Sequence, residues 1–136
     1  MLFSDFNAIK DDLEFIDDWQ EKYAYIIEMG KQLPDIGEDL KKDDHLVPGC
    51  VSRVWLYIED DPEILKFRVF SEALIVNGLL YIVCSIYHGK PLKEINNTDT
   101  ELIFRELGLQ EHLTPSRVNG LRSVIFLIKD YIESKV

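Results

Sequence analysis

The sequence predicts an α+β fold, because patterns typical of helices occur towards both ends of the chain and a β-hairpin pattern lies between them. In residues 19–33, apolar side chains recur at spacings of three and four, which places them on one face of a helix. Residues 51–59 and 65–70 are rich in β-branched and aromatic side chains, and a short polar connection separates them. Spacings of three and four return in residues 118–132 and predict a long last helix.

The two long helices have recognisable ends. Asp17 and Asp18 suit the start of the first one, where carboxylates face the exposed N–H groups and the positive end of the helix dipole. Pro34 ends that helix, since the residue before a proline disfavours the helical conformation. Thr114 is a favourable N-cap for the last helix, and Pro115 is a favourable first helical residue.

The remaining elements are shorter or less clear. Short helices are predicted at residues 6–16, 91–95 and 100–107. The apolar run 73–87 fits either a buried helix or a pair of buried strands: its length favours the helix, whereas residues 81–83 favour a strand. A weakly indicated third strand lies at residues 45–47.

One domain is predicted over residues 1–136, since a chain of this length buries a core and 46% of its residues are hydrophobic. Acidic residues outnumber basic ones 25 to 15, and a net charge of −10 disfavours binding to nucleic acid or to an anionic membrane surface. The first fifteen residues have no signal-peptide pattern. The longest apolar run, 73–87, is too short to span a bilayer, so we expect a cytoplasmic protein.

Cys50 is the leading candidate for a reactive residue. It follows Pro48 and Gly49, which fit the second and third positions of a type II turn and leave Cys50 at the last. This turn ends a polar, irregular segment, which favours a thiol that solvent or a partner can reach. The pattern leaves open the alternative of a half-buried thiol at the start of a strand. Cys84 lies in an apolar run and is expected to pack in the core, so no disulfide framework is predicted.

The reactivity of Cys50 depends on its thiolate. With an ordinary pKa near 8.5, roughly 3% of a free thiol is ionised at pH 7. Arg53 and His45 would lower the pKa, whereas the net negative charge of the chain would raise it. The sequence does not decide between these effects.

Other chemical sites find less support. A metal site needs three or four ligands at short spacing, but the two cysteines lie far apart and the three histidines are scattered: His45, His88 and His112. A Cys–His hydrolase would use His45 or His112 as base, but no glycine-rich oxyanion turn accompanies them. His112 and Arg117 flank the start of the last helix and fit surface or capping roles. A cation in the first turn is mildly unfavourable against the helix dipole, which hints at a further role for Arg117.

Residues 47–56, with the sequence VPGCVSRVWL, closely resemble the Gly-Cys-x-Ser-x-Val-Trp signature of the SufE/CsdE family of sulfur-acceptor proteins. Three further segments match that family in the same order: residues 21–30 with 33–34, residues 73–79, and residues 112–117 with 120–121. The matches extend over most of the chain, and four ordered motifs are far more specific than one.

The resemblance implies a more definite fold than the pattern does. In this family an α+β fold packs a small antiparallel β-sheet against several helices, similar to iron–sulfur scaffold proteins of the IscU type. Residues 1–136 would then form a single SufE-like domain, and the run 73–87 would be a helix.

The resemblance also implies an activity. Cys50 matches the cysteine that accepts sulfane sulfur from the persulfide of a SufS/CsdA-type cysteine desulfurase and passes it towards an iron–sulfur cluster scaffold. Such a carrier activates the desulfurase without being an enzyme itself. Pyridoxal phosphate belongs to the desulfurase, so no cofactor is expected on this chain. Arg117 matches a supporting position near that cysteine, and His112 belongs to the same motif.

Arg53 departs from the family pattern, in which Gln is common at this position. A cation three residues from the thiol would stabilise the thiolate or persulfide anion, or would meet an acidic patch on the partner.

Two other classes of function compete with a sulfur carrier. The shared fold suggests an iron–sulfur scaffold, but one well-placed cysteine disfavours it. An acidic adaptor would regulate a desulfurase without carrying sulfur. The sequence does not separate a Suf-type from a Csd-type role, and it leaves open the next sulfur acceptor and whether the chain forms a homodimer.

Overall fold

The computed structural model describes residues 3–136, except for the side chain of Gln110. In chain order the described elements are α1 (Phe6–Phe15), α2 (Trp19–Gln32), the 3₁₀ helix η1 (Asp43–His45), β1 (Val54–Glu59), β2 (Lys66–Ser71), α3 (Leu74–Tyr87), α4 (Leu92–Ile95), α5 (Thr100–Glu106), the 3₁₀ helix η2 (Gln110–His112) and α6 (Pro115–Lys135). An antiparallel hairpin with helices before and after it confirms the predicted α+β fold.

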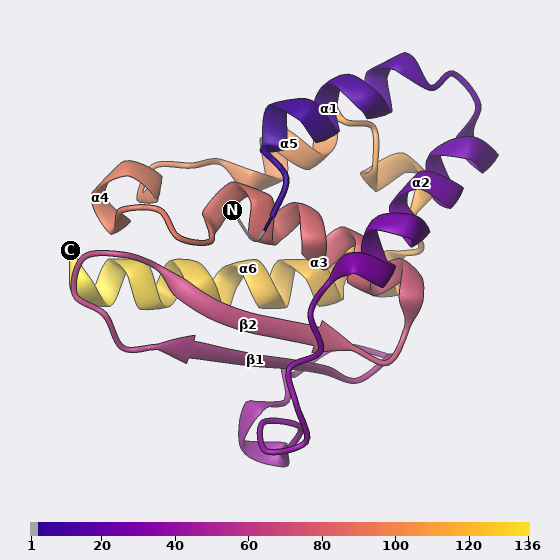
Figure 1. Ribbon diagram of the computed structural model, residues 1–136. Coiled ribbons are helices and arrows are strands. Elements are labelled where there is room, and N and C mark those ends of the chain that lie inside the picture. The colour runs from indigo at the N-terminus through magenta and orange to yellow at the C-terminus, as the bar shows by residue number, and fades with distance from the viewer. Residues whose placement is uncertain (1–2) are drawn as a thin grey trace.

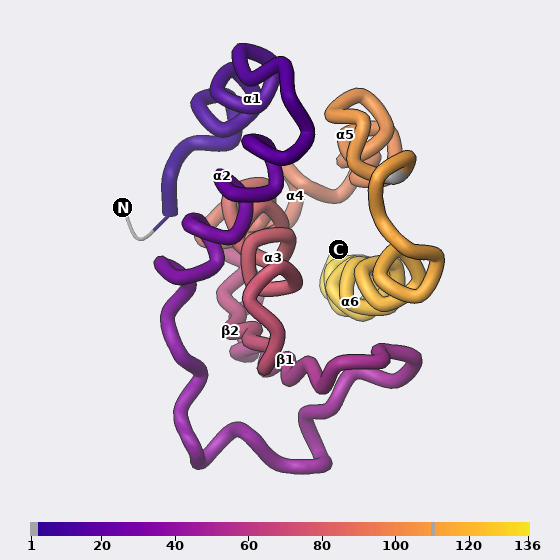
Figure 2. The backbone as a smooth tube through the Cα atoms, turned by 90° about the vertical axis from the view of Figure 1, so that its right-hand side faces the viewer, coloured from indigo at the N-terminus to yellow at the C-terminus, as the bar shows by residue number. Residues whose placement is uncertain are grey.

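Helix α3 lies at the centre of the molecule. Figure 1 shows the β1–β2 hairpin running along α3, with α2 crossing the helix. In Figure 2, α2 and α6 lie on opposite sides of α3, the hairpin lies below it, and α1 and α5 lie above it. Every residue of α3 from Asn77 to Tyr87 is buried. A buried helix is largely apolar all round, which explains the long hydrophobic run in the sequence. Its buried polar side chains, Asn77 and Ser85, are hydrogen-bonded.

The crossing of α2 and α3 depends on two glycines, Gly30 and Gly78. A Cβ atom added at Gly30 would lie 2.5 Å from the Leu74 carbonyl oxygen and 2.7 Å from the Gly78 nitrogen. A Cβ atom added at Gly78 would overlap the backbone and side chain of Ile26. The two backbones therefore touch at this point, and any larger residue at either position would force the helices apart.

The hairpin alternates between an inner and an outer face. In its antiparallel register Leu56 lies opposite Val69, and Trp55 lies opposite Phe70. Successive side chains of a strand point to opposite faces, so Leu56 and Val69 face the helices and belong to the core. Trp55 and Phe70 share the outer face.

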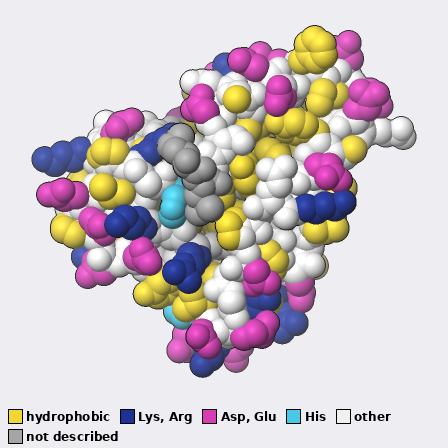
Figure 3. All heavy atoms as spheres, viewed as in Figure 1, with side chains coloured by type: hydrophobic (Ala, Val, Ile, Leu, Met, Phe, Trp, Pro, Cys, Tyr) yellow, Lys and Arg dark blue, Asp and Glu magenta, His cyan; other side chains and the backbone are white. Residues whose placement is uncertain are grey.

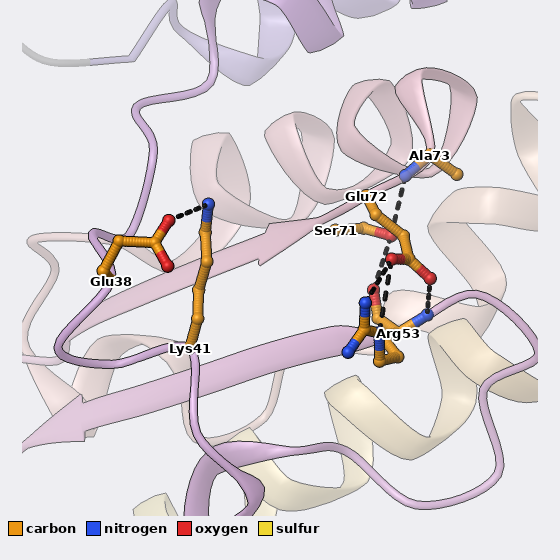
Figure 4. A network of polar contacts seen from close by, with 6 residues as sticks. All are labelled: Glu38, Lys41, Arg53, Ser71, Glu72 and Ala73. Atoms are coloured by element: carbon orange, nitrogen blue, oxygen red, sulfur yellow. Dashed lines mark hydrogen bonds and ion pairs between the residues drawn. The ribbon is translucent and has the colours of Figure 1, made fainter.

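The segment between α2 and β1 is tied to this outer face by Lys41. Its Nζ atom lies 5.1 Å from the ring centre of Phe70 and 6.0 Å from that of Trp55, within reach of cation–π attraction. The same ammonium group lies 3.1 Å from the Asp35 carboxylate and 3.4 Å from that of Glu38; Figure 4 shows the contact with Glu38. These contacts hold the segment against the sheet.

Buried Asn77 joins the end of β2 to the start of α3. Its side-chain oxygen accepts a hydrogen bond from the Ser71 N–H at 2.7 Å, and its amide donates to the Ser71 carbonyl at 2.9 Å. The Ser71 hydroxyl donates to the Arg53 carbonyl at 2.8 Å and accepts from the Ala73 N–H at 3.2 Å (Figure 4). Leaving one of these buried groups unpaired would cost about 1–3 kcal/mol. The network fixes the chain three residues after Cys50.

Most predicted helix boundaries agree with the structure to within two residues. The run 73–87 is a helix, as the family resemblance implied. Thr114 caps α6 through a side-chain bond from the Arg117 N–H at 3.4 Å, whereas Asp18 occupies the N-cap of α2 without such a bond.

The first strand was predicted too long. It begins at Val54 and not at Val51, because the Arg53 N–H donates to the Glu72 carboxylate and not to a neighbouring strand. The weakly indicated strand at residues 45–47 is reduced to a single bridge between Leu46 and Trp55.

We predict that Gly78→Ala lowers the free energy of unfolding by about 1–3 kcal/mol, because the added methyl group overlaps the α2 backbone at Ile26. Urea denaturation followed by circular dichroism measures the effect. Gln20→Ala, at an exposed position of α2, is the matched control and should change the stability by less than about 0.5 kcal/mol. A Gly78→Ala variant as stable as the control would contradict the close crossing.

Candidate functional site

Cys50 follows a tight turn that brings it to α6. Gly49 has a φ of +84°, as the third position of a type II turn requires and as glycine readily adopts. A Cβ atom added at Gly49 would lie 3.3 Å from the Ser123 hydroxyl, so the turn lies directly against α6. Figure 2 shows the segment before β1 passing beneath this helix.

A pocket of about 280 Å³ lies beside Cys50. Its walls come from the loop after the turn, the start of β1, and one face each of α3 and α6. The lining residues are Cys50, Val51, Ser52, Val54, Val76, Leu79, Leu80, Thr114, Ser116, Arg117, Gly120, Leu121 and Val124. The pocket is therefore apolar on the α3 side and polar at the first turn of α6.

The Cys50 thiol is turned inward. Its side chain is half-buried, and its sulfur donates a hydrogen bond to the Gly120 carbonyl oxygen at a distance of 3.7 Å. Burial raises the pKa of Cys50 above its ordinary value, because loss of water disfavours the thiolate. The neighbouring Val51 side chain is 82% exposed, so the same loop buries the thiol and presents an apolar residue to solvent. The inward thiol lies closer to the half-buried alternative than to a freely accessible cysteine, although it does not begin a strand.

Arg117 lines the same pocket as Cys50 and is the one charged side chain among its described lining residues. The side chain is exposed, at the first turn of α6. The structure thus brings together two of the residues singled out in the sequence. Burial is the effect that raises the pKa of Cys50 here, and a cation in the lining of the pocket is expected to act in the opposite direction on an anion at the sulfur.

Arg53 does not share this pocket. Its guanidinium donates to the Glu72 carboxylate from Nη2 at 3.1 Å and from Nε at 3.3 Å, and its backbone N–H donates to the other oxygen at 3.2 Å (Figure 4). The guanidinium also lies 5.5 Å from the ring centre of Trp55. The Glu72 carboxylate therefore offsets the positive charge of Arg53, which the sequence analysis considered as a group that would lower the pKa of Cys50.

The histidines weighed as bases also lie apart from the pocket lining. The His112 ring stacks on Trp19 with ring centres 3.7 Å apart, and its carbonyl accepts a hydrogen bond from the Tyr23 hydroxyl. His45 packs edge-on against Tyr57. Both rings make structural contacts, and neither is among the described residues that line the pocket with Cys50.

Cys84 is buried in the core, as its apolar neighbours predicted, and burial raises its pKa strongly. Across residues 3–136 no cluster of three or more His, Cys, Asp or Glu side chains has an arrangement that could hold a metal ion.

The net negative charge does not form one patch on the face shown in Figure 3, where Lys and Arg side chains stand among the Asp and Glu side chains. The chain also has surface ion pairs between oppositely charged side chains, for example Arg122 with Glu101 and Lys135 with Asp60, both at 2.9 Å. Within the described part of the chain, no helix has both the length and the hydrophobicity needed to cross a membrane.

Sequence reasoning missed the walls of the pocket. Val76, Leu79 and Leu80 were expected as core residues, and Gly120 was noted only as part of a motif. One signal was available for Gly120: glycine inside a helix costs about 1 kcal/mol relative to alanine, and such a residue usually has a packing reason.

The sequence matches the SufE family, described as an Fe-S metabolism associated domain, over residues 7–132. The chain belongs to the SufE family. The match includes the Pro-Gly turn, Cys50 and the first turn of α6, so the pocket lies wholly within the family domain.

Several relatives of known sequence belong to the same family. An uncharacterized SufE-like protein of Rhizobium etli is 42% identical, over 100% of this chain and 93% of its own length. The cysteine desulfuration protein SufE of Wigglesworthia glossinidia brevipalpis is 40% identical, over 83% of this chain and 79% of its own length. The solution structure of a hypothetical protein from Thermus thermophilus has the same fold, with a TM-score of 0.76 at 12% identity, covering 96% of this chain and 94% of that one.

We predict that Arg117 and Arg53 differ in their influence on alkylation of Cys50. Because burial raises the thiol pKa, the rate should rise with pH through a midpoint above that of the urea-unfolded chain. Arg117→Gln should slow the reaction at pH 7 by roughly threefold, since a pKa rise of about half a unit has that effect. Arg53→Gln should leave the rate unchanged, because Glu72 offsets its charge.

The measurement is the rate of reaction with iodoacetamide from about pH 6 to pH 10, read at each cysteine by peptide mass spectrometry. Cys84 serves as an internal standard for folding, since it is buried and should react only when the chain opens. A larger effect from Arg53→Gln than from Arg117→Gln would contradict this assignment.

Proposed function

We propose that this SufE-family chain is a sulfur carrier, in which Cys50 accepts sulfane sulfur from the persulfide of a SufS/CsdA-type cysteine desulfurase and passes it to an iron–sulfur cluster scaffold. The observation that best supports this proposal is the placement of Cys50. Its thiol follows the turn at Gly49 and lies beside a pocket in which Arg117 is the one charged residue among the described lining residues. The chain supplies the thiol and stimulates the desulfurase, but it is not itself an enzyme. Pyridoxal phosphate stays on the desulfurase.

The transfer is a displacement at sulfur. Cys50 loses its proton, and the thiolate attacks the outer sulfur of the donor persulfide. A new S–S bond forms at Cys50, the S–S bond of the donor breaks, and the donor cysteine leaves as a thiolate that takes up a proton. No external oxidant or reductant is required. The rate depends on the pKa values of the attacking and leaving thiols, as in thiol–disulfide exchange.

The inward position of Cys50 supports a loop with two states. A persulfide is easily reduced or oxidised, so a carrier gains by sheltering its sulfur between partners. A sulfur that bonds to the Gly120 carbonyl is sheltered, and it must turn outward to meet a donor on another protein. The segment of residues 34–49 is the part that moves in this proposal, because it has little regular structure. The movement would break the ion pairs and cation–π contacts of Lys41 and the burial of Ile36 and Val47.

Intact mass after incubation with a desulfurase and cysteine tests the sulfur transfer. The wild type should gain one sulfur atom and lose it on treatment with a thiol reductant. Cys50→Ser should gain none, and Cys84→Ser should gain as much as the wild type, because Cys84 is buried in the core. An unmodified wild type under conditions where the desulfurase turns over would reject the carrier.

The same variants separate the competing functions. An iron–sulfur scaffold would bind iron and lose it in Cys50→Ser. An adaptor that only regulates the desulfurase would stimulate it equally well with Cys50→Ser. Turnover of the desulfurase, measured as alanine or sulfide release, and iron content therefore complete the experiment.

Hydrogen exchange of the loop tests the two states. Binding of the desulfurase should lower the protection of residues 34–49, because the contacts to Phe70 and Trp55 open when Cys50 turns outward. Amides of α3 are the control and should keep their protection, since that helix is buried. Equal protection of the loop with and without the desulfurase would argue against an outward movement.

A further inference from the structure

We propose that Gly120 is a positioning residue for Cys50: its carbonyl oxygen holds the thiol hydrogen, and its missing side chain leaves the space in which the sulfur sits. The geometry stands on its own, whereas its importance for sulfur transfer rests on the proposed function. The proposal concerns the same pocket and adds the residue that sets the resting place of the sulfur.

The contact between the two residues is close. A Cβ atom added at Gly120 would lie 3.2 Å from the Cys50 sulfur, 3.7 Å from its Cα and 3.8 Å from its Cβ. Carbon atoms in contact prefer separations of about 3.5–4.0 Å, and sulfur is larger than carbon. Alanine at this position would therefore force the sulfur to shift by a few tenths of an ångström or to turn to another rotamer, although it would leave the Cys50 backbone almost undisturbed.

The need for glycine is specific to this turn of α6. The helix runs from Pro115 to Lys135, so Gly120 lies inside it, where glycine is a poor helix former. The loop approaches the helix at two neighbouring points, Cys50 on Gly120 and Gly49 on Ser123. Later buried positions of α6, such as Val124 and Ile128, carry branched side chains. Helix formation does not favour glycine at position 120, whereas the short distance to the Cys50 sulfur does, because it leaves no room for a side chain.

The carbonyl of Gly120 acts on the protonation of the thiol. A carbonyl oxygen has two lone pairs, so it accepts the S–H in addition to its helical hydrogen bond. A thiolate in the same place would face that oxygen and the apolar side chains of Val54, Leu79, Leu80, Leu121 and Val124. Arg117 is the one charged residue among the described residues that line the pocket, and Ser52, Thr114 and Ser116 are neutral. The place that the sulfur occupies beside Gly120 therefore favours the protonated thiol over the thiolate.

Displacing the sulfur from this place should make it more reactive. A thiol moved away from the carbonyl should have a weaker hydrogen bond and more contact with water, so its thiolate should form at lower pH. Because the thiolate is the nucleophile, alkylation and sulfur acceptance should both become faster. A residue with a merely structural role would not move the pH dependence of this one thiol.

Alkylation of Cys50 in Gly120→Ala tests the proposal. The rate with iodoacetamide at pH 7 should rise roughly threefold to tenfold, and the midpoint of the pH profile should fall, since each unit of pKa changes the thiolate fraction about tenfold. Asn119→Ala, at the adjacent exposed position of α6, is the matched control and should react like the wild type. An unchanged or slower rate in folded Gly120→Ala would overturn the proposal.

A second measurement needs no substitution at Gly120. The infrared S–H band of Cys50, isolated as the difference between the wild type and Cys50→Ser, should be narrow and shifted below the frequency of a thiol in an apolar solvent. An unshifted band, or the broad band of a thiol in water, would overturn the hydrogen bond. Neither experiment uses a desulfurase, so their failure is distinct from a failure of sulfur transfer.

Discussion

The close crossing of α2 and α3 at Gly30 and Gly78 is the constraint on which the rest of the structure depends. It places α3 with one side against α2, and leaves its other sides to the hairpin and α6. One residue before Gly78, the buried side chain of Asn77 holds both backbone groups of Ser71. The Ser71 hydroxyl then holds the carbonyl of Arg53. Three hydrogen bonds thus connect the helix pair to the chain just after Cys50.

The pocket favours the protonated, less nucleophilic form of the Cys50 thiol. Catalytic thiols are commonly activated by a neighbouring base or cation, which lowers the pKa. Here burial raises the pKa of Cys50, the nearest hydrogen-bond partner is a carbonyl oxygen, and Arg53 is paired with Glu72. In the proposed sulfur carrier, these features suit a residue that must resist side reactions between two transfers. Under that proposal the thiol is activated on meeting the partner, with Arg117 in the lining of the pocket as the cation available to the developing charge.

The loop that carries Cys50 is built differently from the core. Lys41 and His45 contact the outer face of the sheet, and Leu46 forms a single bridge to Trp55. Two apolar side chains of the segment, Ile36 and Val47, are buried, far fewer than in α3. Elements with few buried apolar contacts open at lower free energy than the core does. The same fold therefore combines a wall made by α3 and α6 with a segment that has fewer apolar contacts to hold it.

The sequence by itself determined most of the helices, the hairpin, the turn at Gly49 and the burial of Cys84, because each has a local signal: a 3.6-residue period, a cap, a Pro-Gly pair or apolar neighbours. The apolar run 73–87 had no such decisive signal, and the resemblance to the family identified it as a helix. The four ordered motifs also determined the family. Only the tertiary structure decided the surroundings of the thiol. Cys50 and Gly120 lie 70 positions apart, and Arg53 and Glu72 lie 19 apart. No local pattern records such contacts, since they exist only once α6 and the hairpin have packed on α3.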